Sequence, residues 1–461
     1  MTTKLTQNLQ NDDNLFLHPW ESIDEVGHHK RTVVTEGDGI YITDSDGNRL
    51  LDGPAGMWCV NIGHRREEMA KAISDQIMEL TYVSPWSLTN APASVLAEKL
   101  ASLSPGDLNH VFYTTGGSTA VDSALRFVMF RNNVLGLPDK KHIIARHNGY
   151  HGSTYLAASA SGKTRDKNFL DFKADTFHHI SDPNMLDKPE EMTDSQWCQQ
   201  KADEFESKIL EIGPNKVAAF IAEPILASGG VIMAPEGYHA ACLAICRKHD
   251  ILYISDEVVT AFGRLGHFFA SEAVFNIQPD IITCAKGITS GYLPLGAFLV
   301  SDKVLKSVQE KDSGAYFSNG FTYSGHPVSC TAALKNIEII ERDHILEHVR
   351  EVAPYFQSEL QKLRDLPIVK DVRGVGLMAC VECDINQSRD KKLTLDYEIG
   401  NRIDQHCQAL GLLVRPIINM CVMSPPLIIT KAQIDELVSK LRRGIELATQ
   451  DVEKEGLWQR H

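Results

Sequence analysis

The chain has 461 residues, of which 43% are hydrophobic, enough for a large core or for two or more domains. Its 46 basic and 60 acidic residues give a net charge of -14, which argues against nucleic acid or an anionic membrane as a general partner. A small anion can still bind locally at a helix N-terminus, so a phosphate-bearing ligand is not excluded.

The N-terminal stretch, MTTKLTQNLQNDDNLF, has no apolar core and no small-residue cleavage site, so we expect no secretory signal. No uninterrupted apolar run reaches the length of a membrane span. The ten cysteines are scattered, most of them inside apolar runs, which suits buried thiols in a reducing compartment. We therefore predict a cytoplasmic protein without membrane contact.

Between residues 110 and 300, short apolar runs alternate with amphipathic, helix-like stretches. The expected strands are 110–115, 142–147, 217–224, 251–257 and 281–286. Such strands, separated by helices, predict an α/β fold with a mainly parallel central sheet and helices on both faces. The run 296–301 follows residue 286 too closely for a helical crossover, so we expect this strand to be antiparallel. The polar region 184–200 predicts an exposed excursion.

The C-terminal part of the chain has a different pattern. Helical segments are expected at 331–342, 349–364, 395–410 and 431–449, around strands such as GLMACVEC and LLVRPI. This predicts a smaller α+β domain. We expect a large domain over 61–325, the small domain over 326–461, and an N-terminal segment, 1–60, that contributes to the small domain and to the wall of the active site.

Two pairs of cysteines have spacings found in metal or redox sites. Cys380 and Cys383 lie in an alternating pattern typical of a strand, with no second pair nearby. Cys242 and Cys246 are four positions apart on a helical stretch, as expected for one packed helix face. We therefore expect no metal site.

Four groups with chemical potential follow the ends of the predicted strands: the turn Gly116-Gly117-Ser118, the pair Tyr150-His151, Asp256 and Lys286. Ligands of open α/β sheets bind outside the carboxyl ends of the parallel strands, so we expect these groups to converge. Taken singly, each has a plainer interpretation, as a helix cap, a turn residue, a packed loop or a solvated lysine. Together they match one ligand, pyridoxal 5'-phosphate.

The chemistry of that cofactor requires these residue types. A lysine amine forms a Schiff base with the aldehyde, and desolvation lowers its pKa so that it can also act as a base. A carboxylate beside the pyridine nitrogen keeps the ring protonated and makes it an electron sink. Backbone N–H groups at a helix start hold the phosphate.

The chain resembles the class III (subgroup II) aminotransferases, the ω-transaminase group of fold-type I pyridoxal-phosphate-dependent transferases. The resemblance extends from GDGIYITDSDGNRLLDGPAGMWCVNIGH (37–64) to LLVRPIINMCVMSPPLIIT (412–430). Its most specific motif is ISDEVVTAFGRLG followed by PDIITCAKGITSGYLPLGA, which places Asp256 and Lys286 thirty positions apart. The resemblance implies a ping-pong aminotransferase that moves an amino group from an amine or ω-amino acid to a keto acid, with pyruvate as the expected acceptor.

The resemblance also implies roles for single residues. Lys286 would be the Schiff-base lysine, and Asp256 would be the partner of the ring nitrogen. The remaining cofactor-binding residues would be Gly117 and Ser118 at the phosphate, Tyr150 and Val258 on the two ring faces, and Glu223 nearby. Thr322 would complete the phosphate site of the neighbouring subunit in a homodimer. Trp58, Tyr150 and Arg415 would bind substrate, with Arg415 as a mobile carboxylate-binding arginine.

Some features depart from the family pattern or leave alternatives open. The residue after Gly-Ser is Thr119, where the family usually has an acidic residue, and Ile418-Asn419 stands where the family often has Gly-Asp. The second departure bears on substrate preference. The sequence does not choose among ω-amino acid, taurine-like, diamine and simple amine donors, between pyruvate and another keto acid, or between dimer and tetramer.

Other functions remain as alternatives. The same fold could serve an aminomutase or a decarboxylase, or a non-catalytic protein that binds the cofactor. A nicotinamide-dependent enzyme is suggested only by the G-x-G-x-x-A pattern 374–379, which should open a helix. Here the pattern is followed by strand-like alternation, so we reject that interpretation.

Overall fold

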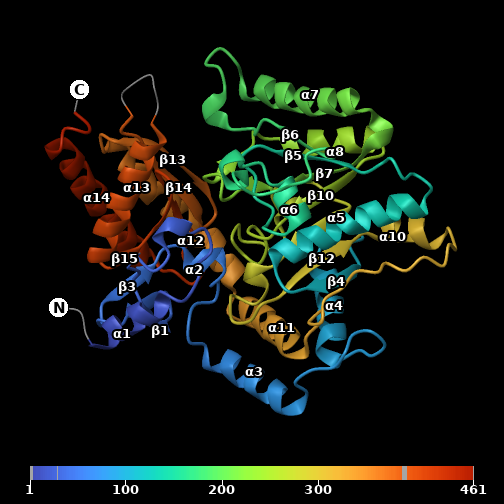
Figure 1. The fold of residues 1–461 in the computed structure, drawn as a ribbon, viewed down its shortest axis with the longest axis horizontal. Coiled ribbons are helices and arrows are strands. Elements are labelled where there is room, and N and C mark those ends of the chain that lie inside the picture. Colours follow the sequence, from blue (N-terminus) through green and yellow to red (C-terminus); the bar gives the residue numbers. More distant parts are fainter. Residues whose placement is uncertain (1–3, 29, 387–391, 460–461) are drawn as a thin grey trace.

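The computed structural model describes residues 4–28, 30–386 and 392–459. Its centre is a seven-stranded sheet with strand order β4-β12-β11-β10-β7-β5-β6 (Figure 1). In that order, the strands are β4 (His110–Thr114), β12 (Gly296–Val300), β11 (Ile281–Cys284), β10 (Leu252–Asp256), β7 (Val217–Ala222), β5 (His142–Arg146) and β6 (Phe177–Ile180). The pairings between β11 and β6 are all parallel, whereas β12 is antiparallel to both its neighbours. The predicted mainly parallel sheet and its antiparallel strand 296–301 are confirmed.

Helices cover both faces of this sheet. Ile281 packs in a cluster with α5 (Gly117–Val134), while its neighbour Ile282 packs in another with α4 (Ala91–Leu103) and α11 (Pro327–Arg342). Because successive side chains of a strand point to opposite faces, these two clusters lie on opposite sides of the sheet. The other helices of this part are α3 (Glu67–Glu79), α6 (Tyr155–Ala160), α7 (Asp194–Ile212), α8 (Tyr238–Lys248), α9 (Ala270–Ala273) and α10 (Asp302–Gln309).

A second, antiparallel sheet has the order β13-β14-β17-β16. Its strands are β13 (Val369–Val375), β14 (Met378–Cys383), β17 (Met420–Met423) and β16 (Arg415–Ile417), and its helices are α12 (Ile345–Gln361), α13 (Leu393–Ala409) and α14 (Lys431–Lys454). The four C-terminal helices and the strand GLMACVEC are thus found within a few residues of their predicted bounds. The run LLVRPI, predicted as one strand, is divided between residues 412–413 and 415–417, which belong to two different sheets. The G-x-G-x-x-A pattern is followed by strand β14, as expected, and Cys380 and Cys383 are buried on it.

The N-terminal part forms a third sheet, of order β1-β2-β3-β15. It joins β1 (Val34–Asp38), β2 (Tyr41–Asp44) and β3 (Arg49–Asp52) to β15 (Leu412–Leu413), and a two-stranded sheet consists of β8 (Ile225–Leu226) and β9 (Ile232–Met233). The remaining elements are α1 (Lys4–Asp13), the distorted turn α2 (Ala55–Trp58), and the 3-10 turns η1 (Ile23–Glu25), η2 (Thr164–Lys167), η3 (Met185–Asp187), η4 (Pro214–Lys216), η5 (Lys286–Ile288) and η6 (Lys362–Asp365). Strand β15 thereby ties the N-terminal segment to the C-terminal part of the chain.

The prediction of an exposed excursion over 184–200 is wrong for its second half. Helix α7 begins at Asp194, and Thr193 and Gln196 form a capping box at its start. Trp197, one turn further, is only 4% exposed. The polar composition that suggested a loop is that of a helix N-terminus followed by an amphipathic helix.

Candidate active site

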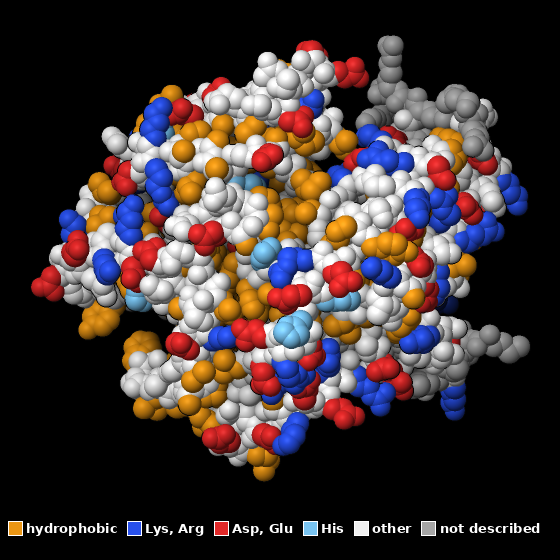
Figure 2. All heavy atoms as spheres, turned by 180° about the vertical axis from the view of Figure 1, so that it is seen from behind, with side chains coloured by type: hydrophobic (Ala, Val, Ile, Leu, Met, Phe, Trp, Pro, Cys, Tyr) orange, Lys and Arg blue, Asp and Glu red, His pale blue; other side chains and the backbone are white. Residues whose placement is uncertain are grey.

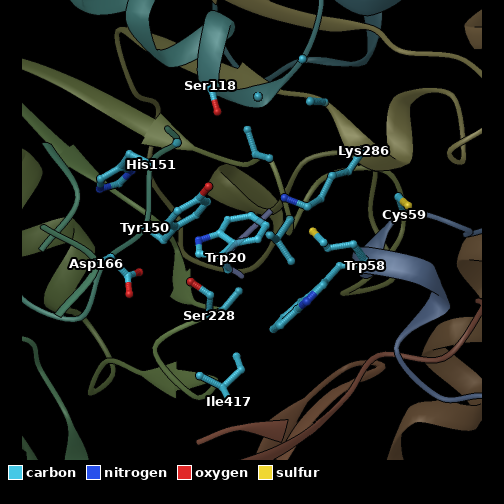
Figure 3. Close-up of a pocket in the computed structure, with 18 of the residues that line it drawn as sticks. Trp20, Trp58, Cys59, Ser118, Tyr150, His151, Asp166, Ser228, Lys286 and Ile417 are labelled. Carbon is cyan, nitrogen blue, oxygen red and sulfur yellow. The ribbon is translucent and has the colours of Figure 1, made fainter. Parts of the chain in front are cut away.

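A cavity of about 1200 Å³ lies at the carboxyl ends of the parallel strands. Its walls come from the strand ends, from the N-terminal segment and from the start of β16. Of the residues predicted to form the site, all except Thr322 line it: Trp58, Gly117, Ser118, Tyr150, Glu223, Asp256, Val258, Lys286 and Arg415. Figure 3 shows Ser118, Tyr150 and Lys286 around this space, with Trp58 on the side of Lys286.

Lys286 follows the end of β11 and opens the turn η5. Its backbone has φ 47°, in the left-handed region that non-glycine residues seldom occupy, and such strain is concentrated at functional sites. Burial lowers the pKa of its amine and outweighs the opposing attraction of Asp256. Among the described residues, no hydrogen bond or ion pair is made to the Lys286 side chain. The amine is therefore a desolvated, unpaired nucleophile directed into the cavity (Figure 3).

Asp256 ends β10 and is paired in register with Thr283 of β11. The Asp256 carboxylate is 3% exposed. Its Oδ1 accepts hydrogen bonds from Thr283 Oγ1 at 3.0 Å and from the Val258 amide at 3.2 Å, and its Oδ2 lies 2.6 Å from His151 Nδ1. The parallel pairing of β10 and β11 is what brings the carboxylate and Lys286 to one edge of the sheet. The predicted convergence of strand ends is observed.

Glu223 follows β7 and is buried behind the loop that carries Tyr150. Its two carboxyl oxygens accept the backbone N–H groups of Tyr150, at 2.8 Å, and of Ala227, at 3.0 Å. Burial raises the pKa of this carboxyl group. Glu223 therefore fixes two loops of the cavity wall.

The turn before α5 is closely packed against Val258, which lies across the cavity wall from it. A Cβ atom added at Gly117 would lie 2.9 Å from Val258 Cγ1, so only glycine fits there. Ser118 Oγ accepts the Ser153 amide at 3.0 Å. Thr119, the departure from the family pattern, donates its hydroxyl to the Gly116 carbonyl at 2.9 Å. The helix start thus presents its N–H groups beside the cavity, as an anion-binding helix N-terminus does.

Trp58 and Arg415, the two residues predicted to bind substrate along with Tyr150, both line the cavity. Trp58 ends the distorted turn α2 with φ 66° and is 4% exposed. Arg415 begins β16, and burial lowers the pKa of its guanidinium. The guanidinium has no hydrogen bond or ion pair with the described part of the chain, and its central carbon lies 6.0 Å from the centre of the Trp20 ring. At this distance the ring is at the outer limit of a cation–π contact, so the guanidinium can pair with a carboxylate.

Several cavity residues were not predicted from the sequence. Trp20 lies over the site, 6.2 Å from the Tyr150 ring, and Glu21 beside it pairs with Arg31 at 2.6 Å. Lys163 Nζ donates to Ser228 O at 2.6 Å and to Ser228 Oγ at 2.9 Å, and burial lowers its pKa to about 8. Asp166 also lines the cavity. The only local signal for Trp20 was the turn-like Pro-Trp pair in a polar segment.

Residues 23–445 match the family model described as "Aminotransferase class-III". The chain belongs to the class III aminotransferases. It is 40% identical to the putrescine–pyruvate aminotransferase of Pseudomonas aeruginosa over 446 residues, which cover 96% of each chain. It is also 39% identical to the mitochondrial γ-aminobutyrate transaminase 1 of Oryza sativa subsp. indica, over 92% of this chain and 82% of the relative.

Solved structures of ω-transaminases have the same fold as this class III aminotransferase. A thermostable (S)-enantioselective ω-transaminase from Thermomicrobium roseum superposes with a TM-score of 0.91 at 35% identity, covering 97% of this chain and 98% of that one. A transaminase from a marine Virgibacillus gives a TM-score of 0.90 at 36% identity, covering 98% and 100%. The predicted resemblance and the fold-type I architecture are confirmed.

Thr322 lies outside the cavity of its own chain. Its side chain is exposed, and its backbone carbonyl accepts a hydrogen bond from the Tyr82 hydroxyl at 2.8 Å. The short connection between α3 and α4, which carries Tyr82, thus holds this segment at the surface of the aminotransferase.

Proposed function

We propose that this class III aminotransferase uses pyridoxal 5'-phosphate to move an amino group from a primary amine or ω-amino acid donor to pyruvate. The observation that carries the proposal is the convergence of Lys286 and Asp256 at adjacent strand ends. Pyruvate and a terminal diamine are supported by the relative named a putrescine–pyruvate aminotransferase. The relatives are named aminotransferases or transaminases, which favours this reaction over an aminomutase, a decarboxylase or a non-catalytic binding protein.

The cavity residues fit the cofactor. Gly117 has no side chain to cover the backbone N–H groups at the start of α5, and a Cβ atom there would meet Val258 at 2.9 Å. Gly117 and Ser118 would hold the phosphate at the helix N-terminus, while Tyr150 and Val258 would face the two sides of the ring. Asp256 would bind the ring nitrogen, and Glu223 would keep the loop of Tyr150 in place.

When bound, the cofactor supplies an aldehyde for amine exchange and a protonated ring that accepts an electron pair. The chain supplies the proton chemistry. The Lys286 amine, whose pKa is lowered by burial, would take a proton from the donor carbon and return one to the acceptor carbon. The buried carboxyl group of Asp256 would keep the ring nitrogen protonated. Trp58 and Tyr150 would orient the substrate, and Arg415 would bind the pyruvate carboxylate.

Lys286→Ala should abolish alanine formation from pyruvate and an amine, and Asp256→Asn should lower it by orders of magnitude. Borohydride reduction of the native protein should leave the cofactor on the peptide that contains Lys286. Putrescine, γ-aminobutyrate, taurine and a simple alkylamine should be compared as donors. Ordinary turnover by Lys286→Ala would refute the proposal, whatever donor is used.

We further propose that the functional unit is a homodimer, in which Thr322 completes the phosphate site of the partner. The exposed position of Thr322 and the hydrophobic residues nearby support an interface. In the connection between α3 and α4, Trp86 and Leu88 are 94% and 60% exposed. Figure 2 shows hydrophobic side chains gathered on the lower part of one face of the molecule. A fully active monomer in sedimentation would refute this assembly, and the same measurement decides between dimer and tetramer.

The predicted location and domain boundaries are also proposals. All ten cysteines are free thiols, which supports a reducing cytoplasm. Among the helices that the structure describes, none is long and apolar enough to cross a membrane. The boundaries at 60/61 and 325/326 are best tested by limited proteolysis.

A further inference from the structure

The turn between β16 and β17 is strained. Ile417 pairs with Met420, so Ile418 and Asn419 form a two-residue hairpin loop. Ile418 has φ 63°, in the left-handed region. Two-residue hairpin loops of this kind normally have glycine or asparagine there, and a β-branched residue is rare because its side chain crowds the backbone. The chain therefore has an unfavourable residue at a position where a glycine would be relaxed.

The surroundings prevent the turn from relaxing. The Asn419 side chain donates to the Cys383 carbonyl at 2.6 Å, and the Asn419 carbonyl accepts the Cys383 amide at 3.0 Å. On the other side, a Cβ atom at Gly400 would lie 1.7 Å from the Ile418 carbonyl oxygen, so α13 packs directly on the turn. The backbone of Ile418 is fixed by contacts on both sides.

Ile418 lines the active-site cavity, three positions after Arg415. Ile417 and two residues of α13, Leu393 and Tyr397, line the same cavity. Leu393 is 50% and Tyr397 43% exposed, so this apolar group lies where the cavity opens to solvent. When the amino group of a donor lies at the Lys286 end of the cavity, its carbon chain would extend towards this opening.

We propose that Ile418 is a specificity-determining residue that contacts the carbon chain of the amine donor. The inference rests on the proposed function and deepens it, because it assigns the apolar part of the donor to a wall of the cavity. Strain in the folded state persists where function requires it, and the contact with the donor supplies that requirement. Substitution by glycine relieves the strain and removes the contact, and the two effects are measured separately: the first in the melting temperature, the second in the dependence of kcat/KM on donor length.

The test measures kcat/KM for linear monoamines from propylamine to heptylamine, with pyruvate as acceptor and alanine as the product measured. In the native protein, kcat/KM should rise with chain length. In Ile418→Gly, the longer donors should lose about threefold to tenfold, while propylamine changes little, because one or two buried methylene contacts disappear. The melting temperature of Ile418→Gly should equal or exceed that of the native protein.

Two further variants keep the result interpretable. Ile418→Asn, which tolerates the left-handed region, should show the same loss for long donors. His344→Gly is the matched control, because His344 also has a positive φ, 52°, but is not among the residues lining the cavity. It should leave the chain-length profile unchanged.

An unchanged profile in both Ile418 variants would overturn the inference, as would an equal loss for all donors. The absence of alanine from every amine in the native protein would overturn the proposed function itself, and the inference with it. The two failures are therefore distinguishable.

Discussion

His151 Nδ1 lies 2.6 Å from Asp256 Oδ2, and both side chains are almost completely buried, at 4% and 3% exposure. His151 is therefore the third hydrogen-bond partner of a carboxylate that also accepts from Thr283 and Val258. A buried carboxylate that loses one partner is destabilised by about 1–3 kcal/mol, because the desolvation is no longer compensated. This geometry makes His151 a positioning residue for Asp256.

We predict that His151→Leu lowers kcat/KM by about 10-fold to 100-fold. His151→Asn should lower kcat/KM less, because the amide N–H of asparagine can take the place of the histidine Nδ1–H. The affinity for the cofactor, measured by fluorescence titration, should fall in the same order. If the leucine and asparagine variants were equal in both measurements, the hydrogen bond to Asp256 would not be the cause.

The sequence predicted the strand-end residues of the site but not the residues that close the cavity from other segments, such as Trp20 and Lys163. Asp256 and Lys286 were predictable because local apolar runs show where the strands end, and parallel pairing then brings the ends together. His151 was noted beside Tyr150, but its bond to Asp256 depends on how the loop folds back. Lys163 and Trp20 lie in polar segments whose position is set by contacts with distant parts of the chain.

The N-terminal segment that carries Trp20 shows why such residues are hard to predict. Arg31 pairs with Glu21 at 2.6 Å and lies 3.5 Å from Asp13, so ion pairs within the segment shape the turn that presents Trp20. None of these charges forms a recognisable motif. The fold, in contrast, can be predicted from the periodicity of apolar residues, and the errors of that prediction are local. The start of α7 resembles a loop in sequence because its capping residues are polar.

Lys163 should make the binding of pyruvate depend on pH. Its pKa, lowered to about 8 by burial, means that the ammonium loses its charge between about pH 7 and pH 9. The KM for pyruvate should therefore rise about threefold to tenfold over this range, as a cation near Arg415 disappears. In Lys163→Met the rise should vanish, and in Lys163→Arg the KM should stay low throughout. The same slope in Lys163→Met and in the native protein would contradict the assignment.

Asp404 should lower the stability of the native protein above pH 6. Burial raises its pKa to about 6, and its Oδ1 has no hydrogen-bond partner among the described residues. Because the folded pKa is above the ordinary value, the folded state prefers the protonated acid. The loss of folding stability caused by ionising Asp404 is absent below about pH 4, grows as the pH rises to about 6, and is constant above that.

Asp404→Asn should therefore raise the free energy of unfolding by roughly 1–3 kcal/mol at pH 7.5 and leave it unchanged at pH 4. Asp203→Asn is a matched control, because exposed Asp203 accepts from Gln199 at 2.8 Å much as Asp404 accepts from Gln408. Denaturant unfolding at both pH values measures the difference. A gain that is equal at the two pH values would show that titration of Asp404 is not responsible.

Arg415 should act on one half-reaction only. Because its guanidinium has no ion-pair partner in the described part of the chain, a carboxylate can bind it without first breaking a salt bridge. A bidentate pair of this kind contributes about 2–3 kcal/mol, so Arg415→Ala should raise the KM for pyruvate about 30-fold to 100-fold. An uncharged alkylamine donor makes no such pair, and its KM should change less than about threefold.

The KM of Arg415→Lys for pyruvate should lie between those of the native protein and Arg415→Ala, since lysine keeps the charge but not the fork geometry. Steady-state kinetics with pyruvate and butylamine measure both constants in one experiment. Equal effects on the two half-reactions would show that Arg415 does not bind the carboxylate.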